Sequence, residues 1–194
     1  MEIIPVIKIK DRKIKNTVTE ELIEFSTNKS KDIPLYILDY DGIEKNKPNL
    51  CTYQKLFNHF KIWTDNGPSN LGDIVDSYMT GVAAIVIRKN FFKKFDPEKV
   101  KYISENKVFL KLDINDKNLD FNLNKDFIDG YVNFSDKEKI DLDFKYKDFL
   151  KTLFSKLYVY ENNIKNLDYW EKKKIKGVLV DFENYLRFLD AIPS

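Results

Sequence analysis

Two stretches of this sequence, about half a chain apart, decide the fold. The first reads Lys61-Ile-Trp-Thr-Asp-Asn-Gly-Pro-Ser-Asn-Leu71, and a helix-like stretch and the apolar run Val82-Ala-Ala-Ile-Val-Ile87 follow it. The second reads Lys156-Leu-Tyr-Val-Tyr-Glu-Asn-Asn-Ile-Lys-Asn-Leu167, and a helix-like stretch and Ile175-Lys-Gly-Val-Leu-Val180 follow it. Each copy has the order strand, polar turn, helix, strand. A unit of this kind repeated within one chain predicts a parallel barrel built from two similar halves.

Eight short apolar runs are predicted to be strands. They are Ile3–Ile9, Leu35–Leu38, Ile62–Thr64, Ala84–Ile87, Val108–Leu112, Tyr131–Phe134, Leu157–Tyr160 and Gly177–Val180. Several are almost continuously apolar, which is typical of parallel strands that are buried on both faces. Helical patterns lie between many of them, at Thr19–Phe25, Cys51–Phe60, Asn70–Met79, Tyr146–Phe154 and Leu167–Lys174, and a further helix is expected at Glu183–Leu189.

The chain of 194 residues is short for a (β/α)₈ barrel, since about 250 residues is typical. The shortage is visible between Asn115 and Asp129, where no helical period is present. We therefore predict a single domain spanning residues 1–194, a trimmed (β/α)₈ TIM barrel with a half-barrel internal repeat. Some of its crossover helices are reduced to loops, and an open or partly collapsed sheet is the alternative.

Composition excludes several function classes. The 33 Lys and Arg residues balance 31 Asp and Glu, and the net charge of +2 argues against nucleic acid and anionic membranes as partners. Cys51 and His59 are the only cysteine and histidine, so neither an intrachain disulfide nor a zinc site is expected. We expect no metal, no other cofactor and no membrane span, and a cytoplasmic location.

Several strands carry a recognisable pattern at their ends. The chain opens with Met1-Glu-Ile-Ile-Pro-Val-Ile-Lys-Ile-Lys-Asp11, and a later strand reads Leu35-Tyr-Ile-Leu-Asp-Tyr-Asp-Gly-Ile43. Both resemble strands of the histidine-biosynthesis barrels, the ribonucleotide isomerase and its cyclase relative. The turn Thr64-Asp-Asn-Gly-Pro-Ser-Asn-Leu-Gly-Asp-Ile74 is similar to the third-strand turn of that family. The resemblance covers almost the whole chain in order, through spacing and strand ends more than through identities.

The resemblance implies two acidic residues, at the ends of the first and fifth strands, that act as general acid and base on a ring-opened sugar. Asp113 stands at the fifth-strand position, but Lys8 stands at the first. A Lys–Asp pair tends to form an ion pair in which both groups stay charged. We therefore expect Lys8 to pair with Asp113 and the isomerase activity to be absent. A nucleophilic role for the Lys8 amine is the alternative.

The phosphate sites of that family are glycine turns whose backbone N–H groups approach the anion. The positions that correspond to them in this chain are Asn66, Gly67, Arg88, Lys89, Asn162 and Asn163. Asp181 at the eighth strand would repel an anion, so we expect only the first-half site to remain, in altered form. The asparagines also suit turns, and Arg88 with Lys89 also suits a solvated strand edge.

Asp39 and Asp41 complete the candidate set, because a pair of carboxylates at a barrel rim suits either a ligand or an ordinary turn. Two functions follow. The first is a diverged barrel without isomerase activity that binds a small phosphorylated metabolite or a protein partner. The alternative is an intramolecular isomerase acting on a phosphorylated ribose-type substrate, with Asp113 and either Asp39 or Asp41 as its acid and base.

Overall fold

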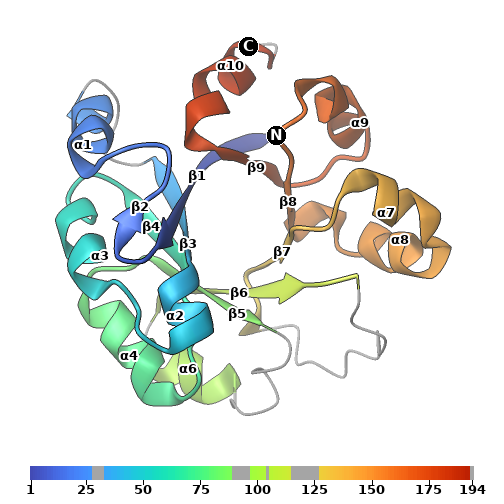
Figure 1. The fold of residues 1–194 in the computed structure, drawn as a ribbon. Coiled ribbons are helices and arrows are strands. Elements are labelled where there is room, and N and C mark those ends of the chain that lie inside the picture. The colour runs from blue at the N-terminus through green and yellow to red at the C-terminus, as the bar shows by residue number, and fades with distance from the viewer. Residues whose placement is uncertain (28–32, 89–96, 104, 115–126, 193–194) are drawn as a thin grey trace.

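A computed structural model describes residues 1–27, 33–88, 97–103, 105–114 and 127–192 (Figure 1). Its strands are β1 (Glu2–Lys10), β2 (Lys13–Ile14), β3 (Pro34–Asp39), β4 (Lys61–Asp65), β5 (Ala84–Arg88), β6 (Lys107–Leu112), β7 (Gly130–Asn133), β8 (Leu157–Tyr160) and β9 (Gly177–Asp181). All except β2 run parallel in chain order, and β1 also pairs with β9. The sheet is therefore a closed eight-stranded barrel, and the open alternative is wrong.

Helices surround the strands on the outside of the barrel (Figure 1). The α-helices are α1 (Thr19–Thr27), α2 (Tyr40–Lys45), α3 (Leu50–Leu56), α4 (Leu71–Met79), α6 (Pro97–Ile103), α7 (Lys137–Leu142), α8 (Phe144–Lys151), α9 (Leu167–Lys172) and α10 (Tyr185–Asp190). Short 3₁₀ turns are η2 (Phe154–Lys156), η3 (Ile164–Asn166) and η4 (Phe182–Asn184). None of the helices described has the length and apolar character that a membrane crossing requires.

The eight predicted strands are confirmed, and each matches one barrel strand closely. The prediction missed β2, α2, α6 and α7. Helix α2 contains Gly42, a poor helix former, and begins because the Asp39 side chain caps its first turn. In α7 only Ile140 is buried, so no apolar stripe marks it. The segment that was expected to be a bare crossover lies largely outside the described residues.

The interior of the barrel is a packed core. Every second residue of a barrel strand faces inward, and the apolar residues that do so form the core: Ile4, Val6, Tyr36, Leu38, Trp63, Ala84, Val86, Phe109, Val132, Tyr158 and Leu179. The Trp63 and Phe109 rings stack with centroids 4.4 Å apart, and Tyr158 meets both edge-on. Because large aromatic side chains fill the lower barrel, any site must lie above them, at the carboxyl ends of the strands.

The two halves of the barrel share details beyond the repeated unit. At the end of β3, Asp39 accepts a hydrogen bond from the N–H group two residues on and another from the Tyr53 hydroxyl. At the end of β7, Asn133 accepts one from the Ser135 N–H and donates to the Tyr146 hydroxyl. Strands β3 and β7 are each the second strand of their half. The same pair of contacts, a turn N–H and a tyrosine hydroxyl on one strand-end side chain, therefore occurs in both halves. The half-barrel repeat is thus visible in side-chain contacts.

Candidate functional site: the barrel mouth

The inward positions become polar directly above the aromatic core. Two residues after the last apolar inward residue of its strand, each of six strands presents a charged or phenolic side chain. These six residues, hereafter the mouth cluster, are Lys8, Asp65, Arg88, Lys111, Tyr160 and Asp181. The alternation of a β-strand and the positions of the strand ends are enough to place them on one face.

Asp65 is the anionic centre of one side of the mouth cluster. Its carboxylate is completely buried and accepts two hydrogen bonds from Arg88, at 3.1 and 3.2 Å, and one from the Lys111 ammonium at 2.6 Å. The Tyr36 hydroxyl donates a fourth at 3.3 Å. Burial opposes ionisation of Asp65, but the two cations outweigh it and hold its pKa below the usual range. Asp65 is therefore a fixed negative charge at neutral pH.

Lys8 is the cationic centre of the opposite side. Its ammonium donates to the Tyr160 hydroxyl at 2.7 Å and lies 2.9 Å from the Asp181 carboxylate. The Asn162 amide donates to both Tyr160 and Asp181. Burial opposes the charge, but the bonds to Tyr160 and Asp181 raise the pKa of Lys8 above its ordinary value. Lys8 is therefore held as an ammonium group.

An aromatic bridge joins the two sides. The Phe134 ring, just after β7, stacks on the Tyr160 ring at 4.6 Å and nearly parallel. On the other side the Lys111 ammonium lies 4.1 Å from the centre of the Phe134 ring, a favourable cation–π distance. One continuous network thus crosses the mouth from Lys8 to Arg88. It contains three cations and two carboxylates, so it carries a surplus of one positive charge.

Two hollows open beside the two lysines. The one next to Lys8 and Asp181 has a volume of about 20 Å³, room for about one water molecule. The other, hereafter the β6–β7 cavity, has a volume of about 160 Å³, and its lining includes Lys111, Asp113, Phe134, Ser135, Asp136 and Lys139. Of these two hollows, only the β6–β7 cavity is large enough for a small organic molecule. Larger hollows of about 310 and 600 Å³ also open among the described residues, but no mouth-cluster residue lines them.

The expected Lys8–Asp113 ion pair is replaced by the Lys8–Asp181 pair. Closure of the barrel explains this, because β1 and β9 are neighbours with Val6 opposite Asp181, whereas Asp113 follows β6 on another part of the ring. Asp113 is exposed, and its charge acts on Lys111 rather than on Lys8. Of the predicted residues, Lys8, Arg88 and Asn162 therefore lie in the mouth network, and Asp113 lies at its rim.

Asp39 points away from the barrel interior. It is completely buried on the helix side of β3, and its carboxylate accepts hydrogen bonds from the N–H groups of Asp41, Gly42 and Asn49, from the Asn49 amide and from the Tyr53 hydroxyl. These partners occupy both oxygens. The carboxylate fixes the start of α2 and the loop that follows it.

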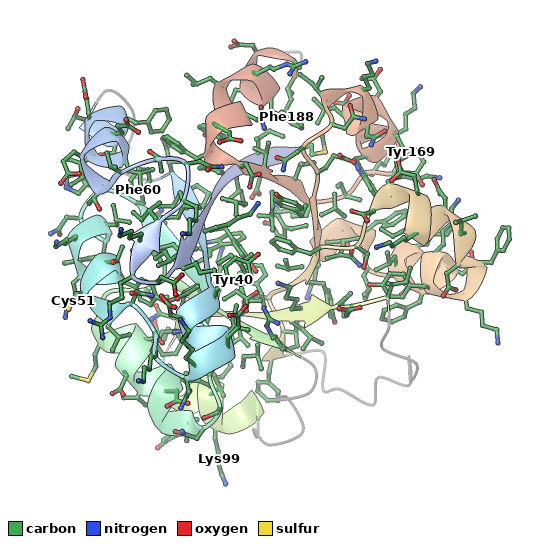
Figure 2. The ribbon with its side chains drawn as sticks, viewed as in Figure 1. Tyr40, Cys51, Phe60, Lys99, Tyr169 and Phe188 are labelled. Carbon is green, nitrogen blue, oxygen red and sulfur yellow. The ribbon has the colours of Figure 1, made fainter. Side chains whose placement is uncertain are left out.

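Asp41 is held in a similar way, farther out. It accepts hydrogen bonds from the N–H groups of Asp11 and Arg12, in the turn after β1, and from the side chains of Lys45 and Asn49. The bond from the Arg12 N–H is the main reason that the pKa of Asp41 lies well below its ordinary value. Asp41 ties the β1–β2 turn to α2, and Figure 2 shows Tyr40, its neighbour in sequence, at the inner end of that helix.

The remaining predicted residues lie outside the mouth network. Asn66 is buried and donates to the Ser77 hydroxyl on α4. Gly67 has a φ of +63°, and an added Cβ would lie 2.8 Å from the Ile43 backbone, so packing against α2 requires a glycine there. Asn163 caps η3. Lys89 lies outside the described residues.

Four members of the mouth cluster were not predicted as site residues. They are Asp65, Lys111, Tyr160 and Asp181, the last of which is the ion-pair partner of Lys8. A usable signal was present in the alternation of each strand, since Asp65 follows Trp63 by two residues and Lys111 follows Phe109 by two. Inward polar residues at strand ends are the natural candidates in a barrel. Within the described ranges, no group of three or more His, Cys, Asp or Glu side chains is arranged to hold a metal ion.

Comparison with known proteins shows the fold. No family model matches the sequence, and no curated protein matches it either. Among solved structures the chain is similar to 3-hexulose-6-phosphate synthase from Salmonella typhimurium, with a TM-score of 0.59 and 10% identity over 99% of this chain and 100% of that one. The chain has a TIM-barrel fold. At this identity the likeness shows the fold alone.

Proposed function

We propose that this chain is a diverged relative of the histidine-biosynthesis barrels that binds a small phosphorylated metabolite at its mouth and lacks their isomerase reaction. The single observation that carries the proposal is the surplus positive charge of the mouth cluster. Three cations face two carboxylates above a packed aromatic core. An anion completes the charge balance of such a site, and a partly buried setting strengthens the attraction.

The same contacts argue against acid–base isomerisation. A general acid or base must exchange a proton near the working pH. Within the described mouth, Asp65 and Asp181 are each held in ion pairs, and the Lys8 ammonium is stabilised in its charged form. Tyr160 does not ionise readily either, because burial raises its pKa. These groups suit binding and positioning better than proton transfer.

The alternative isomerase would use Asp113 with Asp39 or Asp41. Asp113 lies at the rim of the β6–β7 cavity, where a ligand can reach it. Asp39 and Asp41 have structural partners on both oxygens and lie on the helix side of β3 or beyond it. We therefore give the binding function precedence and keep Asp113 as the carboxylate that could still serve the alternative isomerase.

A thermal-shift comparison of ribose 5-phosphate with ribose tests the proposal. Ligand at a hundredfold excess over its dissociation constant stabilises the folded state by about 2.7 kcal/mol, which raises the melting temperature of a chain of this size by roughly 5–10 °C. We expect this shift with the phosphorylated sugar alone, and we expect added salt to weaken it.

Three lysine variants locate the site. Lys8→Met and Lys111→Met each remove one mouth cation and keep most of the apolar stem, whereas Lys55→Met removes an exposed lysine on α3. The shift is expected to fall in the first two variants and to persist in the third. The absence of any shift with ribose 5-phosphate, glycerol 3-phosphate and inorganic phosphate would overturn the proposed function.

A further inference from the structure

We propose that Lys111 is a nucleophilic amine that forms an imine with a small aldehyde or ketone held in the β6–β7 cavity. The inference deepens the proposed function and rests on it, because it adds a carbonyl group to the phosphorylated ligand of the same site. It concerns a residue that belongs to the mouth cluster and also lines the β6–β7 cavity.

The position of Lys111 suits a nucleophile. Only 14% of its side chain is exposed, and its ammonium lies between the Asp65 carboxylate and the Phe134 ring. The same residue lines the β6–β7 cavity. The volume of this cavity, about 160 Å³, is about eight times that of the hollow beside Lys8, which suits a compound of about three carbons with one phosphate. The Ser135 hydroxyl and Lys139 line the same cavity and are the donors for the phosphate. Lys139 is exposed and pairs with Asp136 at 3.2 Å, so it exchanges that partner for the phosphate.

Lys111 rests as one of the three mouth cations, and the charges around it make loss of its proton easier than from an ordinary lysine. Arg88 already meets Asp65 through two hydrogen bonds, so the arginine alone neutralises that carboxylate. Lys111 is then a second cation beside a pair that is already balanced. Burial lowers the pKa of Lys111, and the nearby Arg88 adds to the effect, while Asp65 and Asp113 oppose it. A buried lysine beside another cation is a recognised form of activated amine.

The deprotonated amine keeps its place. A neutral amine has two N–H bonds and one lone pair, so it can still donate to the Asp65 oxygen that lies 2.6 Å away. The Arg88–Asp65 pair stays intact through this change. The carboxylate therefore anchors the nitrogen, whose lone pair stays unshared and can attack a ligand.

The reaction is a simple condensation. The neutral nitrogen attacks the carbonyl carbon, and a proton passes from nitrogen to the carbonyl oxygen to give a carbinolamine. The C–O bond then breaks, the oxygen leaves as water with the second amine proton, and a C=N bond remains. No oxidant or reductant takes part, and water reverses the step.

Lys8 provides an internal comparison on the other side of the mouth. It occupies the corresponding inward position on the first strand of its half. Lys8 bonds the Asp181 carboxylate and the Tyr160 hydroxyl, whereas Lys111 shares the Asp65 carboxylate with Arg88. The bonds to Tyr160 and Asp181 stabilise the ammonium form of Lys8. Its neighbouring hollow holds about 20 Å³, too little for the same ligand. Lys8 should therefore be unreactive where Lys111 reacts.

Borohydride trapping tests the inference. The full chain is incubated at pH 7.5 with dihydroxyacetone phosphate, sodium borohydride is added to convert any imine to a stable secondary amine, and the adduct is located by peptide mass spectrometry. We expect at least a tenfold preference for Lys111 over Lys8 and over the exposed Lys55. Glycerol 3-phosphate, of nearly the same size and charge but without a carbonyl, should bind without giving an adduct.

The variant Lys111→Arg separates imine formation from charge. It keeps a cation beside Asp65 but has no primary amine, so it should retain the thermal shift with glycerol 3-phosphate and lose the adduct. Glycerol 3-phosphate binding together with uniform labelling of Lys111, Lys8 and Lys55 would overturn the inference and leave the proposed function standing. Selective labelling of Lys111 without any binding of glycerol 3-phosphate would support the inference and contradict the phosphate site.

Discussion

Replacing Asp65 with asparagine is the sharpest test of the charge arrangement at the mouth. The carboxylate is completely buried and is the shared partner of Arg88 and Lys111. Removing one member of a buried ion pair typically costs about 3–5 kcal/mol, because a charge is left without compensation. The asparagine keeps the shape of the side chain, so lost packing contributes little. We expect Asp65→Asn to destabilise the fold by about 3–5 kcal/mol at pH 7.

The release of a proton from Lys111 sets an upper limit on that cost. In the parent chain Asp65, Arg88 and Lys111 together carry one positive charge. In Asp65→Asn the same total is reached when Lys111 releases its proton and only Arg88 stays charged. Deprotonating a lysine whose ordinary pKa is about 10.4 costs about 1.36 kcal/mol per pH unit below that value. The limit is therefore about 4.6 kcal/mol at pH 7 and about 1.9 kcal/mol at pH 9. The destabilisation should shrink as the pH rises.

Urea unfolding at pH 7 and pH 9 measures both quantities. The matched control is Asp181→Asn, since Lys8 is 30% exposed and keeps its bond to Tyr160, so we expect a loss of about 1 kcal/mol or less. On the acid side, the pKa of Asp65 is lower in the folded state than in the unfolded one. The stabilisation that ionised Asp65 gives the folded state is thus complete above about pH 4, and it is lost as the pH falls further. A loss below about 1 kcal/mol for Asp65→Asn at pH 7 would refute the reasoning.

Two further substitutions test the frame around the site. Tyr53→Phe removes the buried hydroxyl that donates to Asp39 and should cost about 1–2 kcal/mol by urea unfolding, with the fold unchanged by circular dichroism. Gly81→Ala forces a residue with a Cβ into a φ of +86° against the Phe57 ring and should lower stability by more than about 1 kcal/mol. Gly72→Ala, inside α4, is its control. The φ of Gly72 is not positive and its Cβ would meet only the Asn70 side-chain oxygen, at 3.0 Å, so this change should cost clearly less, and equal effects of the two alanines would contradict the argument.

The sequence predicts the barrel well because its strands are buried on both faces and are therefore almost continuously apolar. That pattern is local, and it locates each strand without knowledge of its neighbours. Helix α2 is different, since Gly42 weakens it and Asp39 stabilises it through contacts with segments on both sides. Short helices that depend on such contacts cannot be predicted from the local sequence pattern.

The candidate site was harder to predict for a related reason. The alternation along β4 and β6 is enough to turn Asp65 and Lys111 inward, but their contact depends on the stagger between strands that are not adjacent. The partner of Lys8 depends on closure, because β9 becomes the neighbour of β1 only when the sheet forms a ring. Charged pairs that join separate strands are therefore properties of the closed barrel rather than of any segment.

The duplication explains why two similar lysines behave differently. In the sequence repeat Asp65 corresponds to Tyr160 and Arg88 corresponds to Asp181, so each half supplies one carboxylate, and the next strand around the ring supplies one lysine. The difference is the third group, which is an arginine beside Lys111 and a phenol beside Lys8. The arginine competes with Lys111 for its carboxylate, whereas the phenol accepts a hydrogen bond from Lys8 and reinforces its charge. Two exchanges within the repeated trio, Asp65 for Tyr160 and Arg88 for Asp181, thus separate a lysine that stays a cation from one that can lose its proton.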